Sequence, residues 1–271
     1  MTYFKVEDTP LVSVILITYN RECFLKETID SILAQTYRNF ELIIIDNFSD
    51  YDFNALVNSY HSNKIRAFQN QNNGIIAINR NFGIERARGN YLAFCDDDDI
   101  WYPNKLEIQV EYIQSHNIDL YSSALMLFGD GVESEKKFFH KYTNRYQIYQ
   151  RNFITPSTVL VRNTLDVRFD EAPDFNCSED WALWTKLITL GFRLYQYPEP
   201  LIKYRVFASN LTKQNRIQPD LKAIRILKKL KRECPKEFKN RYFLTAIIYH
   251  LLKCGAYYSQ YQLLSPSMAP D

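Results

Sequence analysis

The residues from Val12 to Thr18 read VSVILIT, a nearly continuous run of apolar and mostly β-branched side chains. A strand with such a run buries both of its faces, as strands do in a parallel sheet with helices on each side. Residues 23–35 then predict an amphipathic helix, because apolar side chains recur there at helical spacing: Leu25, Ile29, Ile32 and Leu33. The chain therefore opens as a strand followed by a helix that covers it.

Strand and helix patterns go on alternating over the first hundred or so residues. Further strands are predicted at 41–45, 65–68 and 91–95, and further helices at 52–60, 75–88 and after Pro103. This order predicts an α/β fold of the Rossmann-like kind, with a mostly parallel sheet flanked by helices on both faces. In such sheets, ligands bind beyond the carboxyl ends of the strands.

The middle of the chain is less regular. Strands are expected at 118–128, 157–161, 194–197 and 201–207, and residues 132–155 show no clear period. Ser178 offers an N-cap for a helix that Gly191 ends.

Four consecutive aspartates, Asp96 to Asp99, follow the strand predicted at 91–95. Crowded carboxylates repel one another unless a cation lies among them. Hard oxygen ligands suit Mg2+ or Mn2+, which usually share their coordination shell with substrate phosphates. The seven glycines form neither GxGxxG nor GxxxxGK, so a glycine-rich phosphate loop is not expected, which favours a metal. The alternative interpretation is a solvated acidic loop.

Composition restricts the class of protein and of metal site. With 271 residues and 46% hydrophobic content the chain can bury a large core, and we expect a cytoplasmic protein without a signal peptide. The five cysteines are widely spaced and form no CxxC, so reduced thiols are expected rather than disulfides or a zinc site. The four histidines are equally scattered, so a histidine-rich metal site is not expected.

The C-terminal part differs from the rest in charge and in pattern. Residues 213–241 contain eleven Lys/Arg and three Asp/Glu, a local charge of +8, although the whole chain carries only +2. Two helices are expected, separated by Pro235, and the apolar centre of the second is shorter than the ~20 residues needed to cross a bilayer. Two interpretations remain open: a helical hairpin packed on the sheet, and a basic amphipathic helix on an anionic membrane surface.

Four segments together resemble the family 2 glycosyltransferases of the GT-A fold, in the order in which that family carries them. They are VSVILITYNRECFLKETIDSILAQTY, FELIIIDNFSD, NNGIIAINRNFGIERARGNYLAFCDDDDIWYPNKLEIQ and CSEDWALWTKL. The resemblance covers roughly residues 10 to 207. It implies a GT-A glycosyltransferase domain over residues 1–212 and a basic helical region over 213–271.

The resemblance assigns residues to the nucleotide. The loop after the first strand lies against the base in this family, which implicates Thr18, Tyr19 and Arg21, although Tyr19 could equally be a packing aromatic. Asp46, at the end of the second strand, corresponds to the acid that accepts a hydrogen bond from the base, and a turn-forming Asp is its alternative. Asn73, Arg80 and Asn81 correspond to the segment that frames the nucleotide, unless Arg80 is an ordinary surface charge. Asn47 stands where the family often has a second acid.

The aspartate run corresponds to the DxD motif of the family. The register Asp96-Asp97-Asp98 fits best, because a further acid commonly precedes Ile-Trp. It implies that Asp98 holds Mn2+ or Mg2+ and that Asp96 and Asp97 lie near the ribose and the sugar. Asp99 is expected to order the loop or to cap the next helix.

The resemblance also implies a catalytic base. Glu179-Asp180 corresponds to the acidic pair of the family, and Asp180 is the member expected to deprotonate the acceptor hydroxyl. The simpler interpretation is a favourable placement of acids at a helix N-terminus. One departure stands out, because Phe207 replaces the histidine that often ends the last strand in the family. Arg205 or Lys213 would have to compensate.

The function expected from these residues is that of an inverting, metal-dependent transferase. It would move a sugar from a nucleotide diphosphate, with UDP favoured, to a hydroxyl of a glycan or lipid-linked acceptor, in bacterial surface polysaccharide synthesis. Peripheral attachment at the inner face of the cell membrane through 213–241 is part of this expectation. The alternatives are a nucleotidyltransferase, which would need a Gly-rich basic loop after the first strand, and a binding module without activity. Nucleic-acid binding is not expected, since the basic stretch is helical and carries no stacking aromatics in a sheet.

Overall fold

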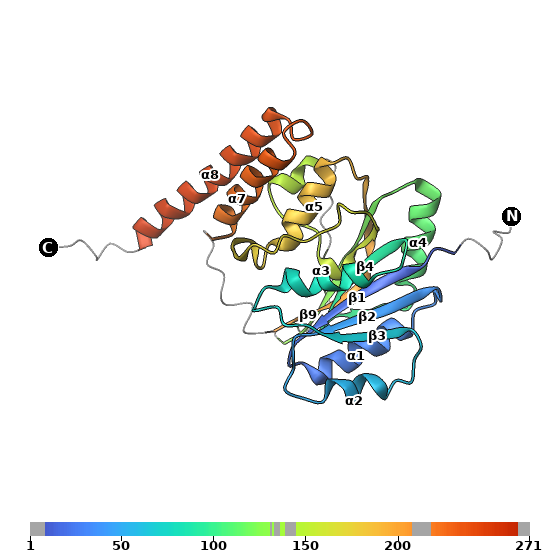
Figure 1. Cartoon of the computed structure of the whole chain (residues 1–271). Coiled ribbons are helices and arrows are strands. Elements are labelled where there is room, and N and C mark those ends of the chain that lie inside the picture. Colours follow the sequence, from blue (N-terminus) through green and yellow to red (C-terminus); the bar gives the residue numbers. More distant parts are fainter. Residues whose placement is uncertain (1–8, 131, 133–135, 139–144, 208–217, 265–271) are drawn as a thin grey trace.

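The parallel half of the fold is built as the alternating pattern predicts. The computed structural model describes residues 9–130, 132, 136–138, 145–207 and 218–264. Among them, nine strands form one sheet in the order β3-β2-β1-β4-β8-β6-β9-β5, with β7 paired to β6 (Figure 1). The first four strands are mutually parallel: β1 (Val12–Thr18), β2 (Phe40–Asp46), β3 (Ile65–Gln69) and β4 (Tyr91–Asp96).

The remaining strands make the sheet mixed at one side. They are β5 (Ile100–Trp101), β6 (Leu120–Gly129), β7 (Lys136–Phe138), β8 (Leu160–Arg162) and β9 (Leu194–Val206). β8 runs antiparallel to both β4 and β6, while β6 and β9 are parallel. Two predictions need correction here. The strand expected at 157–161 begins as a 3-10 turn, η3 (Pro156–Thr158), and the strands expected at 194–197 and 201–207 are one strand, β9.

The register of β9 explains why it continues through two prolines. Pro198 and Pro200 interrupt the sequence pattern, which suggested a break. The pairing of β9 with β6 shifts register between Ser123 and Ala124 and again between Ala124 and Met126. Such irregularities release the ladder hydrogen bonds that proline cannot donate, so the strand continues past them.

Helices cover both faces of the sheet, as predicted. One face packs against α1 (Glu22–Leu33), α2 (Phe53–Asn58) and α4 (Lys105–His116). The other packs against α3 (Ile76–Arg86), α5 (Glu179–Thr189) and the C-terminal helices. Alternate residues of β1 enter the two cores, since Val14 lies in the first and Ile15 in the second. The predicted α/β fold is therefore confirmed.

The C-terminal helices form a hairpin that packs on the sheet domain. α7 (Gln218–Glu233) and α8 (Asn240–Leu264) contact each other, and they contact the 3-10 turns η2 (Arg145–Tyr149) and η4 (Pro173–Phe175). Ala223, Ile226 and Leu230 of α7 are buried in the same core as α5. The boundary predicted at residue 212 and Lys213 lie outside the described residues. Of the helices that the structure describes, none combines the length and the apolar content required to cross a bilayer.

Candidate active site

Three parallel strands end together and place the aspartate run beside two loops. Thr18 of β1 pairs in register with Asp46 of β2, and Ile17 pairs with Asp96 of β4. The four aspartates make a tight turn, in which the backbone N–H of Asp99 donates to the carbonyl of Asp96 over 3.3 Å. The predicted site residues thus come from the carboxyl ends of neighbouring strands.

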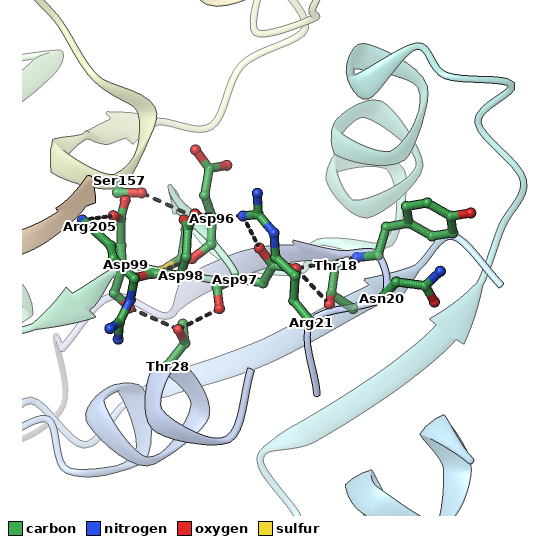
Figure 2. A network of polar contacts seen from close by, with 12 residues as sticks. Thr18, Asn20, Arg21, Thr28, Asp96, Asp97, Asp98, Asp99, Ser157 and Arg205 are labelled. Carbon is green, nitrogen blue, oxygen red and sulfur yellow. Dashed lines mark hydrogen bonds and ion pairs between the residues drawn. The ribbon is translucent and has the colours of Figure 1, made fainter. Parts of the chain in front are cut away.

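Asp97 and Asp98 are joined to the loop after β1 (Figure 2). The Asp97 carboxylate accepts from the Thr18 hydroxyl (2.8 Å), from the Tyr19 backbone N–H (3.2 Å) and from Arg21 Nη1 (3.0 Å). The same Arg21 nitrogen lies 2.5 Å from Asp98 Oδ2. The ring of Tyr19 contributes nothing to this network and is 54% exposed, which argues against a packing role.

Three of the four aspartates have raised pKa values, and burial is the largest cause of each shift. Burial raises the pKa of Asp97 to about 6, although Arg21 opposes the shift. Burial likewise raises the pKa of Asp98, and the nearby charge of Asp96 adds to it. Asp99 is fully buried, its Oδ2 has no hydrogen-bond partner among the described residues, and burial raises its pKa well above the usual range.

The donor set of the run suits a hard divalent cation. Asp96 and Asp98 keep 31% and 14% of their side chains exposed, so their carboxylates are open to solvent at this edge. Within the part of the chain that the structure describes, no three His, Cys, Asp or Glu residues form a ready-made metal cage. Mg2+ and similar ions are commonly held by one or two carboxylates, with substrate phosphates completing the shell. The residues present therefore fit an ion of this class.

Arg80 connects the aspartate run to the acidic pair on α5. It projects from α3, is only 4% exposed, and bonds Asp96 Oδ1 over 2.8 Å and Glu179 Oε1 over 2.6 Å. Burial acts to lower its pKa, but the charges of Asp96 and Glu179 outweigh burial and raise the pKa of Arg80. Such a buried, doubly paired guanidinium is not an ordinary surface charge, which excludes the alternative interpretation.

Asp180 is the second residue of α5 and is half-buried. Its Oδ1 accepts from the backbone N–H of Trp181 over 2.7 Å, and its Oδ2 accepts from Asn152 Nδ2 over 2.8 Å. Burial, together with the adjacent charge of Glu179, raises the pKa of Asp180 to about 6, against the opposing charge of Arg80. A carboxylate in this state can accept a proton near neutral pH.

The residue before this acidic pair does not act as the cap that the sequence suggested. Ser178 occupies the N-cap position, but its hydroxyl donates to the carbonyl of Cys177 and accepts no capping hydrogen bond from a backbone N–H of α5. Glu179 Oε2 is buried without a partner among the described residues. The pair is therefore held by Arg80 and Asn152 rather than by capping alone.

Asp46 lies next to Thr18 in the sheet, and none of the described hydrogen bonds of Asp46 or Asn73 reaches the aspartate run. The fully buried Asp46 carboxylate accepts from the backbone N–H and hydroxyl of Ser49, and from Gln69 Nε2 over 3.0 Å. Asn73 is exposed and has a left-handed φ of 50°, next to Gly74. Asn176 Nδ2 donates to the carbonyl of Gly74 over 2.8 Å, which joins this loop to the segment before α5.

The end of β9 contacts the aspartate run through the backbone and the side chain of Arg205. Arg205 donates its backbone N–H to Asp99 Oδ1 (3.2 Å) and its Nε–H to the Asp98 carbonyl (3.1 Å). Phe207 packs on Phe24, with the ring centroids 5.6 Å apart, and Arg21 lies 5.5 Å from the centroid of the Phe207 ring. Arg205 thus orders the loop together with Asp99. Asp99 is not the cap of the next helix, since that position belongs to Asn104.

Sequence reasoning missed several residues that hold the site. The hydroxyl of Thr28 on α1 donates to the carbonyls of Asp97 (3.0 Å) and Asp99 (2.9 Å), and the backbone N–H of Asp96 donates to Ser157 Oγ (3.2 Å). Thr28 carried a signal, because it is a polar residue on the apolar stripe of a helix and needs a buried partner. Asn152 and Ser157 carried no such signal in the sequence. Asn152 lies within the irregular stretch 132–155, and Ser157 follows it. Asn81 binds Phe169 and Glu171 and pins that segment to α3.

Comparison with known proteins identifies a family whose model matches this chain and proteins of similar sequence. Residues 13–166 match the family model described as glycosyl transferase family 2. The chain is 28% identical over 206 residues to a Bacillus subtilis (strain 168) protein named "Putative teichuronic acid biosynthesis glycosyltransferase TuaG", covering 75% of this chain and 82% of that protein. It is 35% identical over 180 residues to an uncharacterized glycosyltransferase of Rickettsia felis. That match covers 65% of this chain, which spans only 30% of the relative.

Two solved structures share the fold. S. aureus TarS 1-349 in complex with UDP-GlcNAc has a TM-score of 0.69 at 20% identity, over 89% of this chain and 72% of that one. The mannosyltransferase PcManGT from Pyrobaculum calidifontis, in complex with GDP-Man and Mn2+, has a TM-score of 0.63 at 16% identity, over 97% and 77%. At these identities the likeness establishes the fold alone. Since the family model covers more than half of the residues, the chain belongs to glycosyl transferase family 2.

Proposed function

We propose that this chain is an inverting, metal-dependent glycosyltransferase that moves a sugar from a nucleoside diphosphate, with UDP favoured, to a glycan hydroxyl. The observation that carries the proposal is the double ion pair of Arg80, which fixes the aspartate run and the acidic pair of α5 at the two sides of one buried guanidinium. A transferase needs a charged group at the leaving phosphate and a base at the acceptor, and this arrangement supplies both within one network.

The leaving-group side is assigned to the aspartate run. Asp98 is the proposed ligand of Mn2+ or Mg2+, with the carboxylate of Asp96 next to it and Asp97 facing the loop after β1. When bound, the ion would stabilise the negative charge that develops on the departing diphosphate. The solved relative with GDP-Man and Mn2+ supports use of a divalent ion in this fold.

The acceptor side is assigned to Asp180. Its carboxylate takes the proton of the acceptor hydroxyl while the hydroxyl oxygen attacks the anomeric carbon from the face opposite the diphosphate. The new carbon–oxygen bond forms as the bond to the phosphate oxygen breaks, and the electron pair leaves with the diphosphate. One displacement of this kind inverts the anomeric configuration. Asn152 and the Trp181 N–H hold the carboxylate in place for this step.

The nucleotide is assigned to the loops around the run. Thr18, Tyr19, Arg21, Asp46, Asn73 and Arg80 are the proposed contacts, together with Asp96 and Asp97. Tyr19 is 54% exposed, so its ring is available to stack on a base. Asp46 would have to exchange a contact with Ser49 or Gln69 to accept from a base, so it is the weakest member of this set.

The acceptor is proposed to be a glycan, including a lipid-linked one, in the synthesis of a bacterial surface polysaccharide. The support is the name of TuaG, which refers to teichuronic acid biosynthesis. A cytoplasmic location, with an anionic membrane surface contacted by the basic C-terminal region 213–241, accompanies this proposal. The helical region 213–271 is proposed as a unit added to the transferase domain 1–212.

Asp98→Asn tests the metal assignment directly. UDP with Mn2+ should raise the melting temperature of the wild-type protein more than UDP alone, because a ligand bound only to the folded state stabilises it. The variant should lose the increment due to Mn2+, since an amide is a poor ligand for a hard cation. Differential scanning fluorimetry with UDP, GDP and EDTA measures this, and Asp119→Asn is the matched control because Asp119 pairs with Arg193 elsewhere on the surface.

The result also separates the competing functions. An unchanged Mn2+ increment in Asp98→Asn would reject the assignment of the ligand. A binding module would show the increment without any transfer or hydrolysis of a panel of nucleotide sugars. A nucleotidyltransferase would release pyrophosphate from a nucleoside triphosphate instead.

A further inference from the structure

The outer face of α8 exposes a continuous apolar stripe. Leu244, Ile248, Leu251 and Leu252 are 55%, 54%, 54% and 68% exposed. Their spacings of four, three and one residues place them on one side of a helix. The opposite side of α8 is buried, with Ala246 and His250 only 3% and 1% exposed. The side of α8 that carries the stripe is therefore largely uncovered by this chain's described residues, whereas the opposite side is buried.

The position of α8 leaves this stripe free to meet a partner. α8 is the outer helix of the hairpin and extends past the sheet domain (Figure 1), while its inner side reaches α5, where the rings of Trp181 and His250 lie 5.8 Å apart. Its inner side is fixed by His250, whose ring nitrogens contact Asp220 (2.6 Å) and the Tyr149 carbonyl (3.0 Å). This anchor prevents α8 from rotating its apolar stripe inward. Clustered exposed leucines on such an element mark a contact surface.

The charges around the stripe are positive. Residues 240–264 contain no Asp or Glu, and Arg241 is exposed at their start, whereas Lys253 pairs with Asp220 on the inner side of α8 over 3.5 Å. Lys236, Lys239 and Arg241 are all exposed where α8 begins, with Glu237 as the acid among them. A second copy of this helix laid on the stripe would bring these cations together without acids on the helix to pair them. An anionic surface would complement them.

The basic side chains of α7 are largely used within the protein. Lys222 donates to the Asn176 carbonyl over 2.6 Å, Arg225 pairs with Asp174 over 3.4 Å, and Lys229 pairs with Asp170. These contacts attach the hairpin to the segment before α5. The basic stretch that was predicted to bind a membrane therefore uses part of its charge for contacts within the protein. α8 is then the element of the hairpin that remains available to bind a membrane.

We propose that the stripe Leu244-Ile248-Leu251-Leu252 inserts into the interface of a lipid bilayer with anionic headgroups, while the basic residues at the start of α8 contact those headgroups. This inference refines the membrane contact in the proposed function, moving it from the charges of α7 to the apolar face of α8. Binding of a helix in the plane of a membrane is strengthened by both features, the burial of apolar side chains and the attraction of basic residues to anionic lipids. The proposal has the consequence that binding persists in part when salt screens the charges.

Vesicle sedimentation tests the proposal with a matched pair of variants. Wild-type protein should bind vesicles of phosphatidylcholine and phosphatidylglycerol, and a fraction should stay bound in high salt. Leu251→Gln/Leu252→Gln should lower the partition coefficient at least about 10-fold, because two apolar side chains no longer enter the bilayer. Leu165→Gln is the control, since Leu165 is 96% exposed, lies in the loop after β8 and is not part of the stripe, so this variant should bind like the wild type. Lys228→Gln/Arg232→Gln, at two exposed positions of α7, should leave the high-salt fraction intact.

Three outcomes would overturn the proposal. They are wild-type binding by Leu251→Gln/Leu252→Gln, absence of wild-type binding to these vesicles, and a wild-type dimer in solution that the same double variant converts to a monomer. The last would assign the stripe to a second copy. Stabilisation by UDP and Mn2+, measured on every variant, reports folding and the nucleotide site separately. Failure of membrane binding is thereby distinguished from failure of the proposed transferase function.

Discussion

Asp180→Asn is expected to lower turnover by about 10^2- to 10^4-fold while donor affinity stays near that of the wild type. The amide keeps the size of the side chain and its oxygen can still accept from Trp181 N–H, but it has no basic lone pair to take the acceptor proton. The donor diphosphate is assigned to Asp98 and a metal, so its binding should not depend on this carboxylate. Steady-state transfer assays and calorimetric titration with UDP measure the two quantities.

The pH profile distinguishes a base from a structural residue. Since burial raises the pKa of Asp180 to about 6, the carboxylate is protonated below that pH and cannot act. Wild-type kcat/KM should therefore rise with pH through about 6 and then level off, and the residual rate of Asp180→Asn should lack this step. Transfer by the variant at the wild-type rate would assign the base elsewhere. Glu179 would be tested next, ahead of the well-exposed Asp174 that pairs with Arg225.

Arg80→Met is expected to cost about 3 to 5 kcal/mol of unfolding free energy, the range for removing one partner of a buried ion pair. The methionine fills most of the volume but leaves the buried Glu179 carboxylate, whose Oε2 already lacks a described partner, without a counter-charge. The Asp96 carboxylate is partly exposed, so water can solvate it and the loss of its pairing with Arg80 should cost less free energy. Urea unfolding without nucleotide measures the effect.

The control for this variant is an arginine whose ion pair is exposed. Arg193→Gln removes a contact to Asp119 from a side chain that is 47% exposed, and should cost no more than about 1 kcal/mol. Adding Glu179→Gln to Arg80→Met should recover part of the loss, because the uncompensated charge is then removed. A cost for Arg80→Met as small as that of Arg193→Gln would show that the pair is not what holds the two halves of the site together.

The half of the fold that follows local patterns was predictable from sequence. The strand Val12–Thr18 was predicted to the residue, because both of its faces are buried and most of its side chains are apolar. The helices α1 and α3 lie within two residues of the expected bounds, since apolar periodicity and a buried face coincide in them. The coincidence of Thr18, Asp46 and Asp96 at one edge followed from the parallel topology alone.

Features that depend on distant partners were not predictable. β9 reads as two strands because its prolines break the pattern, and only its register with β6 shows that they are bulge positions. Asn152 has no local signal, and it becomes a site residue because α5 brings Asp180 to it. The resemblance pointed to Arg80 as a nucleotide contact, but its double ion pair requires α3, β4 and α5 to converge. The roles assigned to the individual site residues stay predictions.

A crystal structure with UDP and Mn2+, with manganese located by its anomalous scattering, tests the central claim most directly. The account predicts manganese bonded to a carboxylate oxygen of Asp98 and to the diphosphate, at the distances of about 2.0 to 2.2 Å that ions of this size adopt. It also predicts that the Asp180 carboxylate lies on the side of the sugar opposite the diphosphate, where the acceptor hydroxyl would attack. Manganese bound away from Asp98, or a diphosphate held by Arg21 with no metal beside it, would contradict the account.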